Sequence, residues 1–538
     1  MSSSPANPLL QRSGASEQGP ESDVTQSAPG GLFEEHTNPI PKIIRSVVFI
    51  WLAACLVVFV VRSIHWPQVN DPAQVSYLCF LMDHGFVLYR YLIEMNLPGI
   101  YLTNWSVAHL FGAGPLPWRL FDLSLIFAAG VAMICIARGY DWLYGFFAAA
   151  LFALLHGQDG PAQLGQRDFI VAVLFLCAYA FLFEALRREK KWLLFFFGIC
   201  AAAPISFKPQ ALLLTFFLLA ALCWRLRSQQ KPFLQEATWS IAGMAVPILV
   251  VLGFLLETHA LKAFFVMERT LLPYYAMLGR RSLPSLLRLL LVNSIGAFLL
   301  LGIVIALFQR GKWDWERTLL VAGILFGAAS DILQGKGLLY HRYPFAAFVL
   351  LWVAIELAIA TRGAGIPRKL AYVGLLYGAI IAGIFTSRAS NRTWDDTYSQ
   401  TLRGDLVSLG GSNLSGPGLS GSVQCITALP DCATALHHLR LLQSTGLVYD
   451  YYIFGPGNNP AVAYVRQRFW GEFTANRPRV IIVGRWFYTE RADDYSKLNR
   501  WPAFRNDLNQ HYTLLAERSF TPPKRSFLGD GYRIYVLR

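Results

Sequence analysis

The sequence has few charged residues for its length. Asp, Glu, Lys and Arg make up only 15% of its 538 residues, whereas soluble proteins carry about 25%. Hydrophobic residues make up 54%, and the mean hydropathy is +0.40. Apolar runs of roughly 18 or more residues recur along the chain, each long enough to cross a bilayer as a helix. The shortage of charge excludes a soluble protein and indicates a polytopic α-helical membrane protein.

Other absences narrow the possibilities. No spacing of cysteines and histidines resembles a zinc site. The net charge is +14, but the basic residues cluster in short loops, as the positive-inside rule expects, so we expect no nucleic-acid partner. Residues 1–42 are rich in Ser, Pro, Gly, Gln and Glu and predict a disordered cytoplasmic tail. So long a polar segment before the first apolar run argues against a cleaved signal peptide.

Eleven apolar segments are predicted to span the membrane. Five loops rich in Lys and Arg fall on one side of the membrane under this count, which makes that side cytoplasmic together with the N-terminus. The basic loops are 138–142, 187–192, 225–231, 309–317 and 361–369, and the predicted spans are 44–63, 118–137, 143–156, 168–187, 192–207, 209–224, 239–256, 286–308, 318–333, 343–360 and 369–386.

Two folded parts follow from this topology. Residues 43–387 form the transmembrane domain, with a long first outer loop at 64–117. Residues 388–538 mix strand-like runs, such as RVIIVG (479–484) and YRIYVL (532–537), with turn-rich stretches, and 410–421 is expected to be a flexible loop. We expect an extracytoplasmic α/β domain there, long enough to bury its own core.

Most of the eight cysteines lie in apolar runs and are expected to behave as small hydrophobic residues. Cys425 and Cys432 lie in the outer domain instead. A disulfide between them is possible if that domain faces an oxidising compartment, and the sequence leaves this open.

Carboxylates and cations meet at the outer face in this topology. Asp71 directly precedes Pro72, which suits an amphipathic interfacial helix over 72–83 with proline at its first position. On helix physics alone, Asp71 would cap that helix. The other outer loops place cations beside the membrane, where such residues either anchor a span or bind a lipid phosphate. These residues are Arg167, Lys208, Lys336, His341 and Arg342.

The first outer loop also carries a resemblance. Residues 71–112, DPAQVSYLCFLMDHGFVLYRYLIEMNLPGIYLTNWSVAHLFG, are similar to the first loop of GT-C-fold lipid-linked sugar transferases. The protein O-mannosyltransferase and aminoarabinose transferase group is the nearest. Asp71 matches the first acidic position of that loop, and Glu94 matches the acidic residue before its proline. Further similar segments are GFVLYRY (85–91), GQRD (165–168) and KGLLYHRYP (336–344).

The resemblance implies an inverting glycosyltransferase, embedded in a membrane that is bacterial by the same resemblance. Its donor would be a sugar on a polyprenyl phosphate, and its acceptor a protein, lipid or glycan. Asp71 would be the general base, and Glu94 would orient the acceptor or Asp71. Cations would bind the departing lipid phosphate, namely Lys208, Lys336, Arg342 and Arg167, with His341 either binding phosphate or packing under Tyr340.

The loop also departs from the family pattern. Pro72 stands where a second acidic residue is usual, and the loop has no Asp-x-Asp. We therefore expect no essential metal ion and no cofactor.

Three other functions compete with the transferase. A polymerase or ligase that uses polyprenyl lipids usually carries its large functional loop late in the chain, whereas here the acidic loop comes first. A transporter usually shows internal repeats and ionisable residues near mid-bilayer, and neither is visible. A scaffold role for the outer domain stays open.

Overall fold

The computed structural model describes residues 40–538 apart from 231–232, 310–312, 411–417, 486–494 and 522–529. Most of the expected tail and of the expected loop at 410–421, and parts of two basic loops, lie outside the described residues. Helix α1 begins at Ile40, so residues 40–42 are helical and do not belong to the tail.

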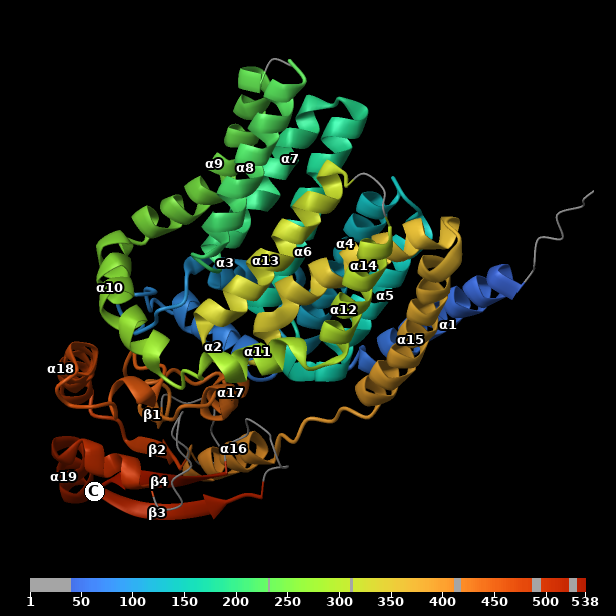
Figure 1. The fold of residues 1–538 in the computed structure, drawn as a ribbon. Helices are drawn as coiled ribbons and strands as arrows, with labels where there is room; N and C mark the ends of the chain where they lie inside the picture. The colour runs from blue at the N-terminus through green and yellow to red at the C-terminus, as the bar shows by residue number, and fades with distance from the viewer. Residues whose placement is uncertain (1–39, 231–232, 310–312, 411–417, 486–494, 522–529) are drawn as a thin grey trace, which may run out of the picture.

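Figure 1 shows a helical bundle above a smaller sheet domain. Helices α6 and α14 lie at the centre of the bundle and are buried along most of their length, as expected of helices that are apolar all round. The bundle comprises α1 (Ile40–Ser63), α4 (Pro115–Ala137), α5 (Trp142–Asp159), α6 (Arg167–Arg188), α7 (Lys191–Ala202), α8 (Ala211–Ser228), α9 (Phe233–Glu257), α11 (Leu283–Leu291), α12 (Ser294–Phe308), α13 (Trp315–Gln334), α14 (Tyr343–Arg362) and α15 (Gly365–Ser390).

All eleven predicted spans are helical in the structure, but the count of eleven is not confirmed. Seven described helices are long and apolar enough to cross a membrane, and the pair α11–α12, bent by 75°, raises the number to eight at most. Helix α7 is apolar but shorter, and α5 and α13 are not among the seven. The chain is thus a multi-pass membrane protein with some helices that are short or less apolar.

A layer of shorter elements covers one end of the bundle. Helix α2 matches the predicted helix at 72–83, but it is not amphipathic: most of its residues are buried, because α3 packs on it from one side and α17 of the sheet domain from another. The layer consists of α2 (Asp71–Asp83), α3 (Pro98–Phe111), α10 (Leu261–Met277), η1 (Pro161–Gln163), η2 (Ala203–Ser206) and η3 (Leu339–Arg342).

The C-terminal sheet domain confirms the expected α/β architecture. Its four strands lie in the order β1-β2-β4-β3, with β1 and β2 parallel and the other pairs antiparallel. Both predicted strands are present, as β2 and β4. Its elements are α16 (Thr397–Gly410), β1 (Val423–Ile426), α17 (Asp431–His438), η4 (Asp450–Tyr452), α18 (Pro460–Ala475), β2 (Val480–Gly484), η5 (Ser496–Arg500), α19 (Pro502–His511), β3 (Tyr512–Ser519) and β4 (Gly531–Leu537).

The sheet domain is docked firmly onto the first outer loop. The N–H of Ile93 donates to the carbonyl of Gly446 at 2.8 Å. A Cβ on Gly446 would lie 1.6 Å from the carbonyl oxygen of Tyr91, so only glycine permits this approach. The two domains therefore meet along the loop that carries the predicted site.

Candidate active site

A cavity lies between the first outer loop, the start of α6 and the sheet domain. It contains about 950 Å³ of empty space, part of it open to solvent. The polar side chains on its wall come from both domains and are Asn70, Asp71, Asn96, Gln166, Arg167, Tyr275, Tyr340, Tyr449 and Tyr451.

Asp71 is the only carboxylate among the described residues that line this cavity. The N-cap position of α2 belongs to Asn70, and no side chain caps the helix, so the expectation that Asp71 is the cap is wrong. The Asp71 Oδ2 atom instead accepts a hydrogen bond from Gln166 Nε2 at 3.4 Å. Its carboxylate is therefore available at the cavity wall.

Arg167 approaches the same cavity from the first residue of α6. Its guanidinium donates to Asn96 Oδ1, and Gln166, one residue earlier, contacts Asp71. A helix N-terminus carries a partial positive charge, and the fixed charge of Arg167 adds to it. The structure thus brings a carboxylate and a cation to one cavity, as the sequence predicted.

Glu94 lies beside the cavity without being part of its described lining. Its Oε1 atom accepts from the backbone N–H groups of Met95 at 2.8 Å and Asn96 at 3.0 Å, and from the Asn96 side chain at 2.9 Å. Burial raises the pKa of Glu94, and these N–H groups and the charge of Arg167 oppose that rise. Glu94 fixes the backbone that presents Asn96 to Arg167.

A second carboxyl group is electrostatically coupled to Glu94. Glu268 on α10 is partly buried, and burial together with the charge of Glu94 raises the pKa of Glu268 to about 8. Sequence reasoning gave no reason to pair residues so far apart in the chain.

Lys208 lies behind Arg167. Its Nζ atom is 3.2 Å from Asp168 Oδ2 and donates to Gln334 Oε1, and Gln334 in turn donates to Asp168 Oδ1 at 3.0 Å. Burial lowers the pKa of Lys208, and the neighbouring Asp168 opposes this effect. Lys208 therefore neutralises a carboxylate next to Arg167 and does not belong to the described lining of the cavity.

Lys336 contacts Tyr275, which lines the cavity, but is not itself part of the described lining. Its Nζ atom lies 3.4 Å from the centre of the Tyr275 ring and donates to the carbonyls of Tyr275 at 2.9 Å and Leu278 at 3.2 Å. Burial, assisted by the charges of Lys208 and Arg167, lowers the pKa of Lys336 to about 7.

His341 and Arg342 point to other partners. The His341 ring packs edge-on against Tyr340 and its Nδ1 atom lies 4.0 Å from Asp331 Oδ1. Arg342 Nη2 donates to both carboxylate oxygens of Asp159, at 2.8 and 3.1 Å. Arg342 also lines a second hollow of about 1190 Å³ beside the α11–α12 break, together with Arg288.

The sheet domain supplies the far wall of the first cavity. Ala428, Leu429 and Pro430 lie there, in a loop whose two ends are joined by the disulfide between Cys425 and Cys432. The possible disulfide is therefore present in the structure, and it restrains a loop at the cavity.

Two tyrosines of this wall are held by a buried ion pair. Tyr449 and Tyr451 stack with ring centres 5.0 Å apart. Asp450 between them forms an ion pair with Lys497, with 2.5 Å between the carboxylate and Nζ, and both side chains are almost fully buried. The run YDYY (449–452) is visible in the sequence, but nothing in it indicates that this segment lies over the first outer loop.

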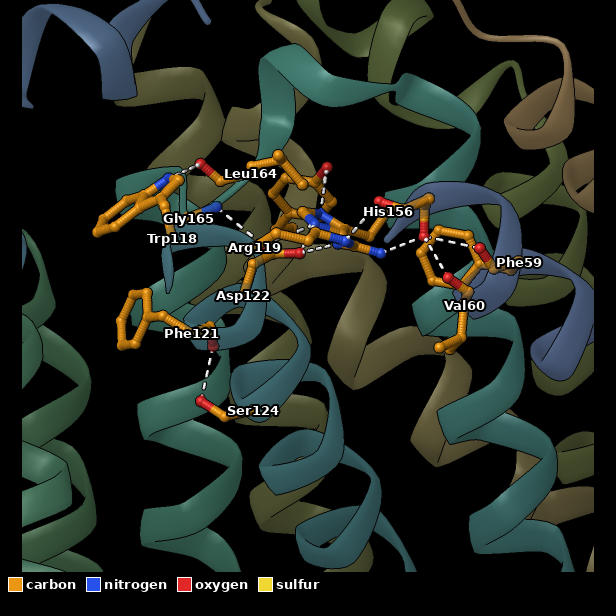
Figure 2. A network of polar contacts seen from close by, with 12 residues as sticks. Phe59, Val60, Trp118, Arg119, Phe121, Asp122, Ser124, His156, Leu164 and Gly165 are labelled. Atoms are coloured by element: carbon orange, nitrogen blue, oxygen red, sulfur yellow. Dashed lines mark hydrogen bonds and ion pairs between the residues drawn. The ribbon is translucent and has the colours of Figure 1, made fainter. Parts of the chain in front are cut away.

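A second missed feature contacts Gly165, a residue of the cavity lining, and is drawn in Figure 2. Asp122, fully buried in α4, accepts hydrogen bonds from Arg119, from the backbone N–H of Gly165 at 2.8 Å, and from His156, whose Nε2 lies 3.0 Å away. Arg119 also donates to the carbonyl of Ser63 at 3.0 Å. Charged residues inside apolar helices are costly and rare. The presence of Arg119 and Asp122 in an apolar segment was therefore the sequence signal that could have revealed this network.

Among the described residues, no group of three or more His, Cys, Asp or Glu side chains is arranged to hold a metal ion. The polar groups that line the cavity are a carboxylate, a guanidinium, side-chain amides and tyrosine hydroxyls.

No family model matches the sequence, and no curated protein matches it. Solved structures do. The structure of ArnT from Cupriavidus metallidurans bound to undecaprenyl phosphate aligns with a TM-score of 0.51 at 13% identity, over 91% of this chain and 98% of that one. The apo structure of the same protein gives 0.48 at 13% identity over 91% and 98%, and the Archaeoglobus fulgidus oligosaccharyltransferase tethered with an acceptor peptide gives 0.47 at 11% identity over 90% and 73%.

The likeness to ArnT extends over both domains and confirms the expected fold. This chain has the GT-C fold found in lipid-linked sugar transferases.

Proposed function

We propose that this protein is an integral membrane glycosyltransferase that moves a sugar from a polyprenyl-phosphate donor to an acceptor in the first cavity. The observation that carries the proposal is the meeting of Asp71 and Arg167 in one cavity, linked by Gln166. A transfer of this kind needs a base for the acceptor and a cation for the leaving phosphate, and this cavity supplies one of each. The GT-C fold supports the proposal because ArnT shares it and binds undecaprenyl phosphate.

Asp71 is the general base in this mechanism. The acceptor hydroxyl or amine loses its proton to the Asp71 carboxylate as its oxygen or nitrogen bonds to the anomeric carbon. The bond between that carbon and the phosphate oxygen breaks, and the lipid phosphate leaves with the electron pair. Attack from the face opposite the leaving group inverts the anomeric configuration. A positioned base contributes about 10²–10⁴ in rate.

Arg167 stabilises the leaving phosphate. It lines the cavity, its guanidinium is positioned by Asn96, and a guanidinium can bind phosphate through two parallel hydrogen bonds. Lys208 assists indirectly, because its ion pair with Asp168 reduces the negative charge beside Arg167. Burial lowers the pKa of Lys336 to about 7, so this residue, which contacts Tyr275, contributes a charge only below about that pH.

Arg342 fits the donor's approach better than the chemical step, whereas His341 packs against Tyr340 and lies outside the described lining of both hollows. The hollow that Arg342 and Arg288 line has five leucine and valine residues beside Ser285, Asn293 and Asp331, and it shares Leu338 with the first cavity. Such a hollow suits a prenyl chain beside a charged headgroup. We assign the sheet-domain wall, with Tyr449 and Tyr451, to the acceptor side, because aromatic rings that carry hydroxyl groups suit a sugar or a hydroxylated acceptor.

The test is a transfer assay with purified full-length protein in liposomes. Undecaprenyl phosphate carrying labelled hexoses, pentoses or aminosugars is supplied in turn, with membrane extracts as the acceptor source. Released undecaprenyl phosphate and labelled product are quantified, and the anomeric configuration of the product is determined by NMR.

The proposal expects acceptor-dependent release of undecaprenyl phosphate and an inverted product for at least one donor. Folded protein that consumes none of these donors would contradict it. A product with retained configuration would contradict the single-step mechanism while leaving a transferase.

A further inference from the structure

Three polar contacts converge on the turn that carries Gln166 and Arg167. The indole N–H of Trp118 donates to the carbonyl of Leu164 at 3.1 Å, and Asp122 Oδ1 accepts from the N–H of Gly165 at 2.8 Å. Both contacts come from the first two turns of α4, and Figure 2 shows them side by side. On the far side of the turn, Gln166 contacts Asp71.

Steric contacts restrict the backbone of this turn in addition to the three hydrogen bonds. Gly165 has φ of +60°, and a Cβ there would lie 2.4 Å from Trp118 Cζ2. A residue with a side chain would have to adopt a disfavoured backbone and displace the indole. The backbone geometry of the turn is therefore set by its contacts with α4. The turn then determines where α6 begins and where Arg167 is placed.

Asp122 is itself held on several sides. Arg119 donates to its Oδ2 atom, His156 Nε2 lies 3.0 Å from Oδ1, and His156 Nδ1 lies 3.0 Å from the Tyr343 hydroxyl on α14. The guanidinium of Arg119 also lies over the ring of Phe59 on α1. His156 on α5 thus contacts this carboxylate directly, and side chains of α14 and α1 contact His156 and Arg119 in turn. The carboxylate itself is outside the described lining of the cavity.

We infer that Asp122 is a positioning residue for the transfer site: through the N–H of Gly165 it holds the turn that places Gln166 on Asp71 and Arg167 at the cavity. This rests on the proposed function for its catalytic consequence, but not for its structural one. A displacement of about 1 Å at a reacting group can cost about a hundredfold in rate, so the turn has to be held as firmly as the base.

A buried ion pair elsewhere in the bundle provides the matched control. Glu356 on α14 receives two hydrogen bonds from Arg317, at 2.8 and 2.6 Å, and both residues are buried. Arg317 lies near the start of α13, at the opposite end of that helix from the cavity. Asp122→Asn and Glu356→Gln each remove the charge of one buried carboxylate that an arginine contacts, but only the first carboxylate touches the turn.

The experiment combines hydrogen exchange with kinetics on full-length protein. Amide exchange of the peptide spanning 162–168 is followed by mass spectrometry in wild type and both variants. Where donor turnover is measurable, kcat and KM for the undecaprenyl-phosphate donor are compared. We expect Asp122→Asn to accelerate exchange in this peptide about tenfold or more and to lower kcat by about ten- to a hundredfold, whereas Glu356→Gln changes neither.

Unchanged exchange and unchanged kcat in folded Asp122→Asn would overturn the inference, as would equal changes in both variants. If wild type turns over no donor, the proposed function fails and the exchange result alone decides the role of Asp122. If Asp122→Asn does not fold, Trp118→Phe replaces it. This variant removes the hydrogen bond to Leu164 and shortens the ring that packs against Gly165, so it loosens the same turn. We expect a change of the same sign, whereas no change would count against the inference.

Discussion

Replacing Arg167 by glutamine tests the phosphate-binding half of the site. The substitution removes the guanidinium that lines the cavity and donates to Asn96 Oδ1, and it leaves a shorter, neutral amide. A hydrogen bond to a charged group contributes about 1.5–3 kcal/mol, and every 1.4 kcal/mol changes a dissociation constant about tenfold. We therefore expect Arg167→Gln to weaken binding of undecaprenyl phosphate by about ten- to a hundredfold.

The assay is competition binding of undecaprenyl phosphate to purified protein in nanodiscs. Arg392→Gln is the matched control. Arg392 lies just beyond the end of α15, its Nε atom donates to the carbonyl of Gln158 at 2.7 Å, and Arg392 is not in the described lining of the cavity. It should bind lipid phosphate as wild type does. Equal affinities for wild type and Arg167→Gln would refute the assignment of Arg167, and equal losses in both variants would show only a general effect of positive charge at the membrane surface.

Three further predictions concern stability. Gly165→Ala should destabilise the protein by about 2 kcal/mol or more, because left-handed backbone alone costs roughly 1–2 kcal/mol and the methyl group would collide with Trp118. Thermal unfolding measures this loss, and an unchanged Tm would contradict the geometry of the turn. Burial and the charge of Glu94 raise the pKa of Glu268 from 4.5 to about 8, so the folded state binds more protons than the unfolded state between these values. Stability should therefore fall as pH rises through this range, by at most about 1.4 kcal/mol per pH unit. Glu268→Gln should reduce the loss of Tm between about pH 5.5 and pH 8.5, and an unaltered loss would exclude this group. Cys432→Ser should lower the stability of the sheet domain by about 2–3 kcal/mol and make the loop at 428–430 more sensitive to proteolysis. Cys200 is a free cysteine of the bundle, and Cys200→Ser is the control that should change neither property.

The first outer loop shows what the sequence could predict of the site. The apolar runs located the bundle helices, and the acidic residues of the loop made Asp71 and Glu94 candidates from the sequence alone. Arg167 was predicted as a neighbouring cation because it begins a span. Each of these predictions rests on local signals: hydropathy, a proline at a helix start, and charge next to an apolar run.

The parts of the site that could not be predicted from the sequence depend on packing between segments far apart in the chain. Tyr449 and Tyr451 reach the cavity only because the sheet domain docks on a loop more than three hundred residues earlier. Lys336 and Arg342 were predicted as phosphate ligands from their place in a short outer loop, yet the structure places them against Tyr275 and Asp159. A pattern of charges locates a membrane edge, but it does not say which charges are already neutralised by neighbours.

The network around Asp122 could be predicted from the sequence only in part. Arg119, Asp122 and His156 stand inside or at the edge of apolar runs, where an ionisable residue needs a partner. The sequence therefore signals that these residues are paired. It does not signal that the pairing supports the turn at Gly165, because that depends on how α4 and α5 pack.

The measurement that most directly tests Asp71 as the base of the proposed sugar transfer compares Asp71→Asn with Asp83→Asn. Both residues lie on α2 and both variants lose one negative charge, but Asp83 accepts from Trp105 at the other end of the helix. We expect Asp71→Asn to lower kcat by about 10²–10⁴ with little change in Tm or in donor KM, while Asp83→Asn retains transfer. Wild-type turnover by Asp71→Asn, or equal losses in the two variants, would contradict it.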